Sequence, residues 1–308
     1  MKNNLITLFA GLLAAFMLFS CSEDYLPDYS LPENNTQLQM KSVAIYSEGF
    51  ESGNGTIREF VSGDTIGLLL SEYHRGNPFL FITREPYWWQ LSEPVFLNYE
   101  PVRLLAYYPY RHNNHAHLSV KEVEVEHVSQ TDYMHGRDMH GYISRDKPYA
   151  DIEMKHVLAM VQFKFNKNYY QHDCSVQRVS INNADGITHL KSKGILNLEN
   201  GQISFVEGFY DQAFIIPDDM NFYEPYTSEE EYARILVMPM EPVKNYGDIF
   251  FDFIIDGNYY KWIVDVGTNW ESGMKYTYEV EMTPNARMQK SSAETENVHV
   301  ALTQIKKY

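Results

Sequence analysis

The stretch His156-Val157-Leu158-Ala159-Met160-Val161-Gln162-Phe163-Lys164-Phe165 carries the clearest structural signal in the 308-residue sequence. One set of alternate positions, from Val157 to Phe165, is apolar throughout, whereas the other begins apolar and ends in Gln162 and Lys164. A period of two is typical of a β-strand, in which successive side chains point to opposite faces. We therefore predict a strand over residues 156–165 that is buried on both faces at its start and wetter at its end.

Short apolar runs bounded by Gly, Pro, Asp or Asn recur along the rest of the sequence. Phe250–Ile255 and Tyr259–Val264 flank Asp256-Gly257-Asn258, and Asp-Gly between apolar runs predicts a β-hairpin. Aromatic residues make up 15% of the chain, and they suit half-buried pleated surfaces. After residue 20, no apolar stripe with helical spacing extends beyond about two turns. The pattern predicts an all-β fold built as sandwiches or barrels.

The N-terminus has the features of an export signal. The lone Lys2 is followed by an apolar run that starts near Leu5 and ends in Leu18-Phe19-Ser20-Cys21, a lipobox. We predict that Cys21 is acylated and becomes the first residue of the mature chain. Two alternatives remain: a signal peptide cleaved nearby, with Cys21 incidental, and an uncleaved membrane helix. The run reaches only about 15 residues, whereas a spanning helix needs about 20.

Several acyl chains would hold the mature protein on a bilayer lastingly. Ser22-Glu23-Asp24 resembles the surface-export signal of lipoproteins in Bacteroides-type bacteria, although a short acidic linker would look the same. We therefore expect a surface-exposed protein anchored in the outer membrane by lipid.

A domain boundary is predicted between Gly141 and Pro148, where polar and turn residues cluster. The sequence predicts a signal peptide, a lipidated tether, an N-terminal β-sandwich and a C-terminal β-sandwich with a terminal strand, at residues 1–20, 21–37, 38–147 and 148–308.

Charge and cysteine content exclude several classes of function. The formal net charge is −16 and becomes −17 once Lys2 is lost with the signal, so the chain repels phosphate backbones and anionic lipid. We therefore expect no nucleic-acid partner. Cys21 and Cys174 are the only cysteines. With Cys21 acylated, Cys174 has no disulfide partner, and stability must come from packing.

Histidines gather at His112, His115 and His117 and again at His135 and His140. Imidazoles at such spacing can share a metal, but stable sites need further ligands held rigidly. The first group lies in a polar loop and the second surrounds a glycine, so we predict no metal site. A metal-dependent enzyme would require His135 and His140 to converge with a carboxylate.

Catalytic patterns are otherwise missing from the sequence. It contains no Gly-x-Ser-x-Gly elbow, His-Glu-x-x-His pair or phosphate-cradling glycine loop. His172 precedes Cys174 closely, but a lone exported thiol in a turn is more often inert. We therefore predict that the protein is not an enzyme and needs no cofactor.

Clusters of aromatic residues suggest a second function, sugar binding. They occur at Tyr87-Trp88-Trp89, Tyr107-Tyr108-Pro109-Tyr110 and Tyr259-Tyr260-Lys261-Trp262. Flat rings stack on the apolar faces of sugars. Alternate residues of a strand face opposite sides, however, so about half of each cluster should be core. A surface glycan-binding lipoprotein would need exposed Trp88 or Trp89 as a stacking platform.

A set of segments stands in a fixed order over residues 38–282. The segments are Ser62-Gly63-Asp64-Thr65-Ile66-Gly67-Leu68, Trp89-Gln90-Leu91 with Pro94-Val95-Phe96-Leu97, Leu105-Ala106-Tyr107-Tyr108-Pro109-Tyr110, Asp132-Tyr133-Met134-His135-Gly136, Lys155-His156-Val157-Leu158-Ala159, and Trp270-Glu271-Ser272-Gly273-Met274-Lys275-Tyr276-Thr277-Tyr278. They resemble elements of the fimbrillin (Mfa-like) family, the subunits of Bacteroides-type adhesive pili. Their order, their spacing and the lipobox together make the resemblance specific.

The resemblance implies two tandem transthyretin-like (Greek-key) β-sandwiches and a fimbrial subunit that contributes to adhesion. It implies assembly by strand exchange, in which a trypsin-like protease removes an early strand and a neighbour's strand fills the groove. Such β-augmentation satisfies an exposed ladder edge and an apolar groove at once. Between Cys21 and Arg75 the only Lys or Arg residues are Lys41 and Arg58, and we predict cleavage at Arg58.

The leaving strand would be Leu38–Tyr46, with Leu38, Met40, Val43 and Ile45 as its apolar residues, and the donor would be Val298–Ile305, with Val298, Val300, Leu302 and Ile305. The expected partners are other pilus subunits, in a homo- or hetero-polymer, and host or bacterial surface glycans or proteins. The chain is shorter than typical stalk subunits and its tail matches the family poorly. Stalk, tip and accessory roles therefore stay open, and an uncleaved form would act as an anchor.

Overall fold

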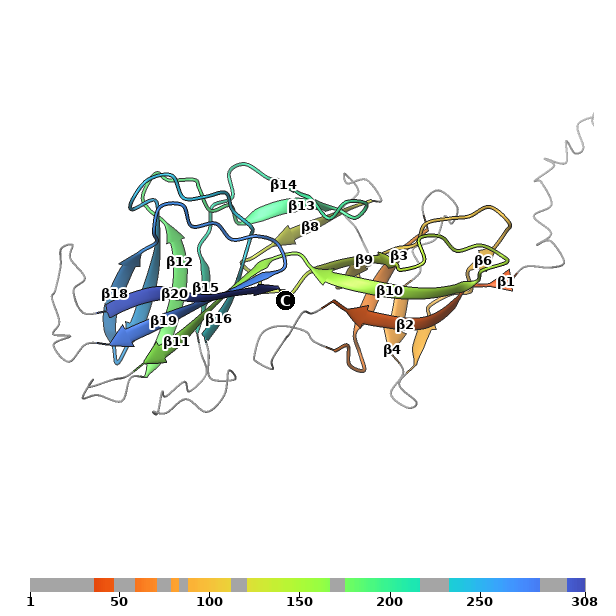
Figure 1. Cartoon of the computed structure of the whole chain (residues 1–308), viewed down its shortest axis with the longest axis horizontal. Coiled ribbons are helices and arrows are strands. Elements are labelled where there is room, and N and C mark those ends of the chain that lie inside the picture. The colour runs from red at the N-terminus through yellow and green to blue at the C-terminus, as the bar shows by residue number, and fades with distance from the viewer. Residues whose placement is uncertain are drawn as a thin grey trace, which may run out of the picture. The chain divides into compact units, whose positions relative to one another are not determined.

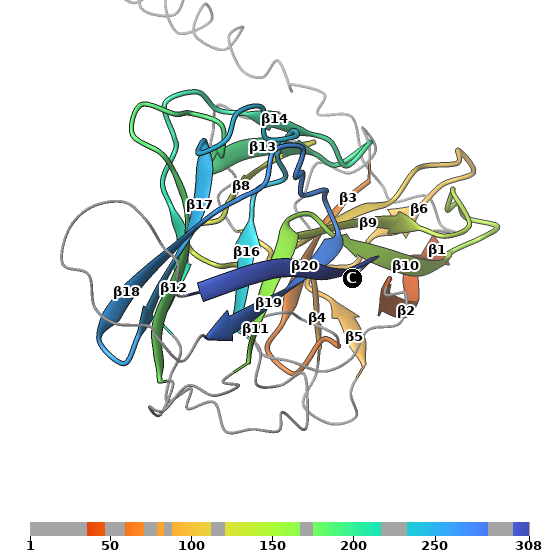
Figure 2. The same ribbon diagram turned by 60° about the vertical axis from the view of Figure 1, so that its left-hand side comes forward.

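A computed structural model describes residues 36–46, 59–70, 79–82, 88–111, 121–166, 175–216, 233–282 and 298–307. Every regular element in these ranges is a β-strand, and the sheets pack around shared apolar cores as in a sandwich (Figures 1 and 2), which confirms the all-β prediction. Within the same ranges, no helix has the length and apolar character needed to cross a membrane. Residues 36–308 form one compact unit.

The first half of the described chain forms a seven-stranded sheet and a separate two-stranded one. The strands are β1 (Thr36–Gln37), β2 (Gln39–Ile45), β3 (Thr65–Leu69), β4 (Phe79–Ile82), β5 (Trp89–Leu91), β6 (Phe96–Leu97), β7 (Leu105–Tyr108), β9 (Met134–Asp138) and β10 (Tyr149–His156). The order in the larger sheet is β2-β10-β9-β7-β3-β4-β5, and β1 pairs with β6. Only the β2–β10 pair of the larger sheet is parallel.

The sequence of β10 shows how the core of this sheet arises. Ala150, Ile152 and Met154 are fully buried, whereas the residues between them are half-buried or exposed. Because side chains alternate across a strand, one face of β10 contributes to the apolar core and the other faces outward. The same core contains Ile66 of β3 and Leu80 of β4, so it joins strands that lie far apart in the sequence.

The second half forms two four-stranded sheets. Their strands are β11 (Ala159–Asn166), β12 (Val176–Asn183), β15 (Ala213–Ile215), β16 (Ala233–Val237), β17 (Ile249–Ile255), β18 (Asn258–Ile263), β19 (Met274–Met282) and β20 (Val298–Lys307). One sheet has the order β16-β11-β19-β20 and the other β15-β12-β17-β18. Figure 1 shows β20, in dark blue, beside β19.

Aromatic rings fill the core between these two sheets. Phe163 of β11 meets Phe251 of β17 edge to face, with ring centroids 4.9 Å apart and planes at 82°. Trp270 is fully buried against Phe251, and its indole N–H donates to the hydroxyl of Tyr278. Edge-to-face aromatic pairs are worth about 1 kcal/mol each beyond their area burial. The core between the two sheets therefore depends strongly on ring contacts.

The stretch predicted as one strand over residues 156–165 is divided between two sheets. β10 ends at His156 and β11 begins at Ala159, and the two residues between them bond elsewhere: Val157 N–H donates to Tyr133 O, and Leu158 O accepts from Gly273 N–H. The prediction of a single strand is therefore wrong at its start. The predicted burial is confirmed, because Ala159 to Phe163 are buried throughout and Lys164 is half-buried.

A three-stranded sheet pairs residues from the two halves of the chain. It consists of β8 (Glu122–Glu126), β13 (Lys193–Asn197) and β14 (Ile203–Phe205) in the order β14-β13-β8. β8 pairs antiparallel with β13, so Val125 lies opposite Gly194. Its apolar side chains share a core with Leu105 of β7 and Met160 of β11. This sheet therefore ties strands of the N-terminal half to the C-terminal sandwich.

The turn after β8 is bonded to the end of β16. The side chain of Gln130 donates to Leu236 O at 2.8 Å and accepts from Leu236 N–H at 2.8 Å, as a neighbouring strand would. His127 is fully buried, and its Nδ1 accepts from Met238 N–H at 3.2 Å while its Nε2–H donates to Asp211 O at 2.9 Å. Both ring nitrogens are thus satisfied by the neutral imidazole.

Sheet membership bears on the predicted domain boundaries. β10 begins after the predicted break at residues 147/148, yet it lies in the seven-stranded sheet because its apolar face completes that core. We propose that the N-terminal domain extends to about residue 157, and the two tandem domains themselves stay a prediction. Thr36 and Gln37, which the sequence assigned to the tether, pair with β6.

The hairpin predicted at Asp256-Gly257 is confirmed. β17 and β18 pair antiparallel up to Ile255 opposite Asn258. Asp256 and Gly257 both have positive φ, at 49° and 74°. Two successive positive φ values are the signature of the two-residue turn that matches the twist of paired strands.

Candidate functional site

The segment predicted to leave is an edge strand. β2 pairs in parallel with β10, from Gln39 opposite Tyr149 to Ile45 opposite Met154, and in the described part of the chain it has no other strand partner. Leu38, just before it, is buried, and its N–H donates to Val95 O. Met40, Val43 and Ile45 are half-buried against the core of the seven-stranded sheet. The four predicted apolar residues therefore lie together at one edge of that sheet.

Polar contacts also hold β2 on β10. The Ser42 hydroxyl donates to Asp151 Oδ1 at 2.5 Å, and the other carboxylate oxygen lies 3.0 Å from His140 Nε2. The hydrogen bonds from Ser42 and His140 lower the pKa of Asp151. Lys41 Nζ sits 4.4 Å from the centroid of the Tyr149 ring. Asp151 therefore binds both the edge strand and the turn after β9.

Replacing Ser42 by Ala should loosen this edge. Loss of a hydrogen bond to a carboxylate weakens the local structure by about 1.5 kcal/mol, which corresponds to an exchange rate about tenfold faster for the amide hydrogens of β2. Hydrogen exchange at Gln39 and Tyr46, whose N–H groups donate to Pro148 O and Met154 O, measures the effect. Ser92→Ala, which removes the acceptor of the Phe79 N–H at the opposite edge, serves as the control. Unchanged exchange in β2 would contradict the prediction.

A groove separates β2 from the other edge strand of the same sheet. A cavity of about 470 Å³ is lined by the segments 37–40 and 89–94. Its apolar lining residues are Leu38, Met40, Trp89, Leu91 and Pro94, and polar residues such as Gln39 and Gln90 lie between them. We name it the β2–β5 groove. An extended chain that entered it would lie between the two edge strands of the sheet and meet both apolar and polar side chains.

The predicted donor strand is the edge of another sheet. β20 pairs antiparallel with β19, from Val298 opposite Met282 to Lys307 opposite Met274, with an irregularity where Thr277 and Tyr278 meet Gln304 and Leu302. Val300 is buried at 5% exposure, but Leu302 and Ile305 are 44% and 51% exposed. Leu302 and Ile305 are therefore only partly buried by their own sandwich. The leaving and donor segments lie in different sheets.

Several predicted residues lie outside the described ranges. They are Cys21, Arg58, Cys174 and the histidines His112, His115 and His117. Lipidation, cleavage and the first histidine group thus stay predictions.

The predicted tryptophan platform is not formed as a pair. Trp88 is 69% exposed, whereas Trp89 of β5 is half-buried and meets the ring of Phe60 edge to face at 5.4 Å. Successive residues at the start of a strand point to opposite faces. Of these two tryptophans, Trp88 alone is exposed enough to stack on a sugar.

His135 and His140 do not converge. His135 of β9 packs against Gly201 in the turn between β13 and β14, and burial, with Lys155 and Arg137 nearby, lowers its pKa to about 4. His140 instead contacts Asp151. Among the described residues, no group of His, Cys, Asp and Glu is arranged to hold a metal ion.

The sequence patterns did not show that the segments resembling the fimbrillin family contact one another in the fold. Tyr108 donates its hydroxyl proton to Asp64 Oδ1 at 2.9 Å, and Tyr107 lies over Gly67 so closely that a methyl group there would overlap its ring. These contacts link the segment at 62–68 to the one at 105–110. Each segment looks like an isolated pattern in sequence, because the partner is about forty residues away.

A second pair of segments meets at the passage from β10 to β11. His156 Nδ1 lies 2.8 Å from Asp132 Oδ1, and both side chains are almost fully buried. Ser272 donates to Val157 O at 2.7 Å. Removing one partner of a buried hydrogen bond leaves the other unsatisfied and generally costs about 1–3 kcal/mol. These segments therefore stabilise the passage from β10 to β11 through hydrogen bonds.

The comparisons with known proteins agree with this fold. A family model described as fimbrillin-like matches residues 55–300. The structure is similar to that of a candidate cell adhesion protein from Bacteroides uniformis, with a TM-score of 0.63 and 16% identity over 90% of this chain and 98% of that one. It is also similar to one from Bacteroides ovatus, with a TM-score of 0.60 and 13% identity over 89% and 98% of the respective chains. No curated protein matches the chain.

Proposed function

Because the chain belongs to the fimbrillin-like family, we propose that it is a pilus subunit that assembles by exchange of strands between molecules. Family membership supports association with other subunits, a place in the cell-surface fimbrium and a non-enzymatic role. Lipid attachment at Cys21 and anchoring in the outer membrane are parts of the proposal that rest on the sequence. The role within the pilus, as stalk, tip or accessory subunit, is left open.

The position of β2 carries the proposal. It is held by one parallel neighbour, and its departure would uncover the backbone groups of β10 together with the core around Ile152. An unpaired ladder edge beside an apolar groove is a site for an added strand. A strand from another subunit would regain both the backbone hydrogen bonds and the apolar burial.

The second half of the exchange would use β20 of another copy. Its Leu302 and Ile305 are about half exposed in their own sandwich, so transfer into an apolar groove gains burial that the free subunit lacks. Each fully buried Leu or Ile side chain contributes about 2 kcal/mol. A strand at a sheet edge can also leave without breaking pairing on a second side.

Release of β2 requires a cut beyond it. Lys41 lies within the paired strand, with its ammonium group over the Tyr149 ring. Proteases of the trypsin class cut best in segments that are not held in a sheet. These contacts favour Arg58, which follows β2 in the sequence, over Lys41 as the site.

Arg58→Ala should abolish polymerisation triggered by trypsin. In the unmodified protein, we expect a new N-terminus at Glu59 and the appearance of polymers, because the segment that contains β2 is no longer covalently attached. Mass spectrometry identifies the cut, and size-exclusion chromatography with electron microscopy detects the polymers.

Lys41→Ala is the matched control, since it removes the other basic residue of this region and should still be cut and polymerise. Polymers formed equally well by Arg58→Ala would refute the cleavage site. Unmodified protein that is cut at Arg58, loses β2 and stays monomeric would refute strand exchange itself.

A further inference from the structure

A second cavity lies away from the β2–β5 groove, where β12 ends and β15 begins. Its volume is about 410 Å³, within the range of small-molecule sites. The residues that line it include Val128, Asn182, Tyr210, Asp211, Gln212 and Phe214. We name it the Asn182–Phe214 cavity. It combines aromatic rings with amide and carboxylate groups, and neither strand exchange nor the sequence patterns account for it.

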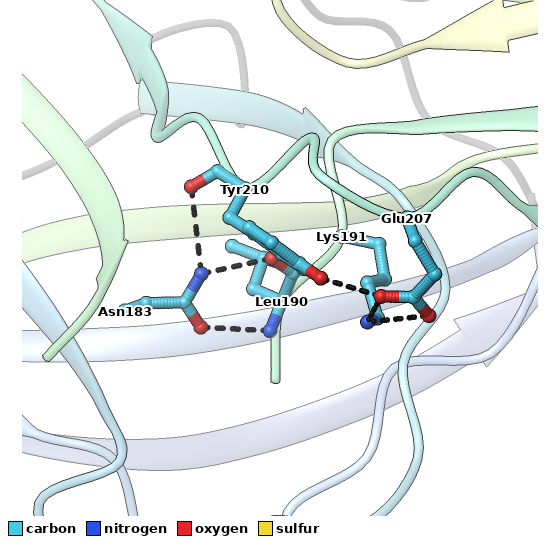
Figure 3. Close-up of polar contacts among 5 residues, drawn as sticks. All are labelled: Asn183, Leu190, Lys191, Glu207 and Tyr210. Atoms are coloured by element: carbon cyan, nitrogen blue, oxygen red, sulfur yellow. Dashed lines mark hydrogen bonds and ion pairs between the residues drawn. The ribbon is translucent and has the colours of Figure 1, made fainter. Parts of the chain in front are cut away.

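The Tyr210 ring of this cavity is held in place from two sides. Its hydroxyl donates to Glu207 Oε2 at 2.5 Å, and Lys191 Nζ lies 4.6 Å from the ring centroid (Figure 3). Lys191 also contacts both carboxylate oxygens of Glu207 at 3.0 Å. The ring therefore loses little conformational freedom when a ligand packs against it.

Asn183 holds the backbone of Leu190 and Tyr210 in place. Its amide group donates to Leu190 O at 2.8 Å and to Tyr210 O at 3.5 Å, and its Oδ1 accepts from Leu190 N–H at 2.7 Å (Figure 3). On the other side of the cavity, the guanidinium carbon of Arg178 lies 4.7 Å from the Phe214 ring centroid. The rings of Tyr210 and Phe214 are thus both positioned before any ligand arrives.

Hydrogen bonds to described residues occupy only some of the donors and acceptors of the cavity's polar side chains. Asn182 Nδ2 donates to Asp252 Oδ2 at 3.0 Å and to Ser180 Oγ at 3.3 Å, which leaves its carbonyl oxygen as an acceptor. Asp211 Oδ2 accepts from Ser192, which leaves Oδ1. The exposed side chain of Gln212 makes no hydrogen bond with any described residue. A ligand that carries several hydroxyl groups fits this set of acceptors and one amide.

We propose that the Asn182–Phe214 cavity binds a pyranose unit of a neutral glycan. A pyranose has apolar C–H faces that pack on rings such as Tyr210 and Phe214, and hydroxyl groups that donate to Asn182 Oδ1 and Asp211 Oδ1. The Asp211 carboxylate and the net charge of −16 disfavour acidic sugars. The half-exposed Val128 supplies a further apolar contact.

Saturation-transfer NMR and titration of the purified protein test the site. The probes are methyl β-galactopyranoside, methyl α-mannopyranoside and N-acetylglucosamine, with N-acetylneuraminic acid as the acidic comparison. We expect saturable binding of at least one neutral sugar. Gln212→Ala and Phe214→Leu should each weaken it about fivefold or more, because each removes one contact worth about 1 kcal/mol.

Gln202→Ala is the control. Gln202 lies outside the cavity, so this variant should bind sugar as the unmodified protein does. Thermal unfolding of each variant shows that the fold is kept. The absence of binding by every neutral sugar overturns the proposal, as does stronger binding of N-acetylneuraminic acid. Binding that both cavity variants retain at full strength overturns the location.

Discussion

Gly136→Ala is expected to lower the free energy of unfolding by about 3 kcal/mol or more. Gly136 lies in β9, which is paired with β10 on one side and β7 on the other. A Cβ at this position would lie 2.4 Å from Glu153 O and 2.5 Å from Met154 Sδ. Because the closest atom belongs to the backbone of a paired strand, relief requires the ladder itself to shift.

Gly141→Ala provides the matched control for this prediction. Gly141 lies just after β9 and has a φ of 86°, but a Cβ there would meet no atom within 4 Å. Its substitution should cost about 1 kcal/mol, through backbone strain alone. Urea unfolding measures both variants. Equal losses for the two substitutions would mean that close packing of β9 on β10 does not limit stability.

The buried His127 should make the protein less stable in acid. Burial lowers its pKa from 6.5 to about 4. In the unfolded chain it binds a proton as the pH falls below about 6.5, whereas the folded protein keeps it neutral. The contribution is therefore fully present above pH 6.5 and is lost progressively down to pH 4. At about 1.4 kcal/mol per pH unit, the loss amounts to about 3 kcal/mol.

Urea unfolding between pH 6.5 and pH 5 isolates this effect, because most carboxyl groups titrate at lower pH. His127→Gln should flatten the pH dependence by about 1.4 kcal/mol per pH unit, leaving the contribution of His135, whose pKa burial also lowers. Gln130→Ala removes the neighbouring bonds to Leu236 without removing a titratable group, so its curve should run parallel to that of the unmodified protein. A parallel curve for His127→Gln would contradict the assignment.

The predictions that rested on local patterns succeeded where the pattern reflects burial of single residues. The alternation over residues 156–165 correctly indicated a strand that is buried on both faces at its start. The Asp-Gly pair correctly indicated the β17–β18 hairpin. Neither pattern could reveal that the chain changes sheet at Val157 and Leu158, because both residues are apolar and continue the alternation.

The two candidate sites also differ in how far the sequence could predict them. The edge position of β2 was expected from its family resemblance, since a leaving strand must lie at an edge. The Asn182–Phe214 cavity combines Val128, Asn182 and the segment 210–214, which are separated by up to 86 positions in the sequence. No local spacing marks these residues. The exposed tryptophan that the sequence suggested for sugar binding lies elsewhere, beside β5.

Local patterns were enough to predict an all-β protein that resembles fimbrillin-like proteins and begins with a lipoprotein-like signal, because alternation, turn residues and short motifs are local properties. The pairing of β8 with β13, the parallel pairing of β2 with β10 and the meeting of aromatic and amide residues in one cavity became visible only in the folded chain. Such pairings depend on which distant faces fit together and bury the most apolar surface, and each strand alone is compatible with many partners.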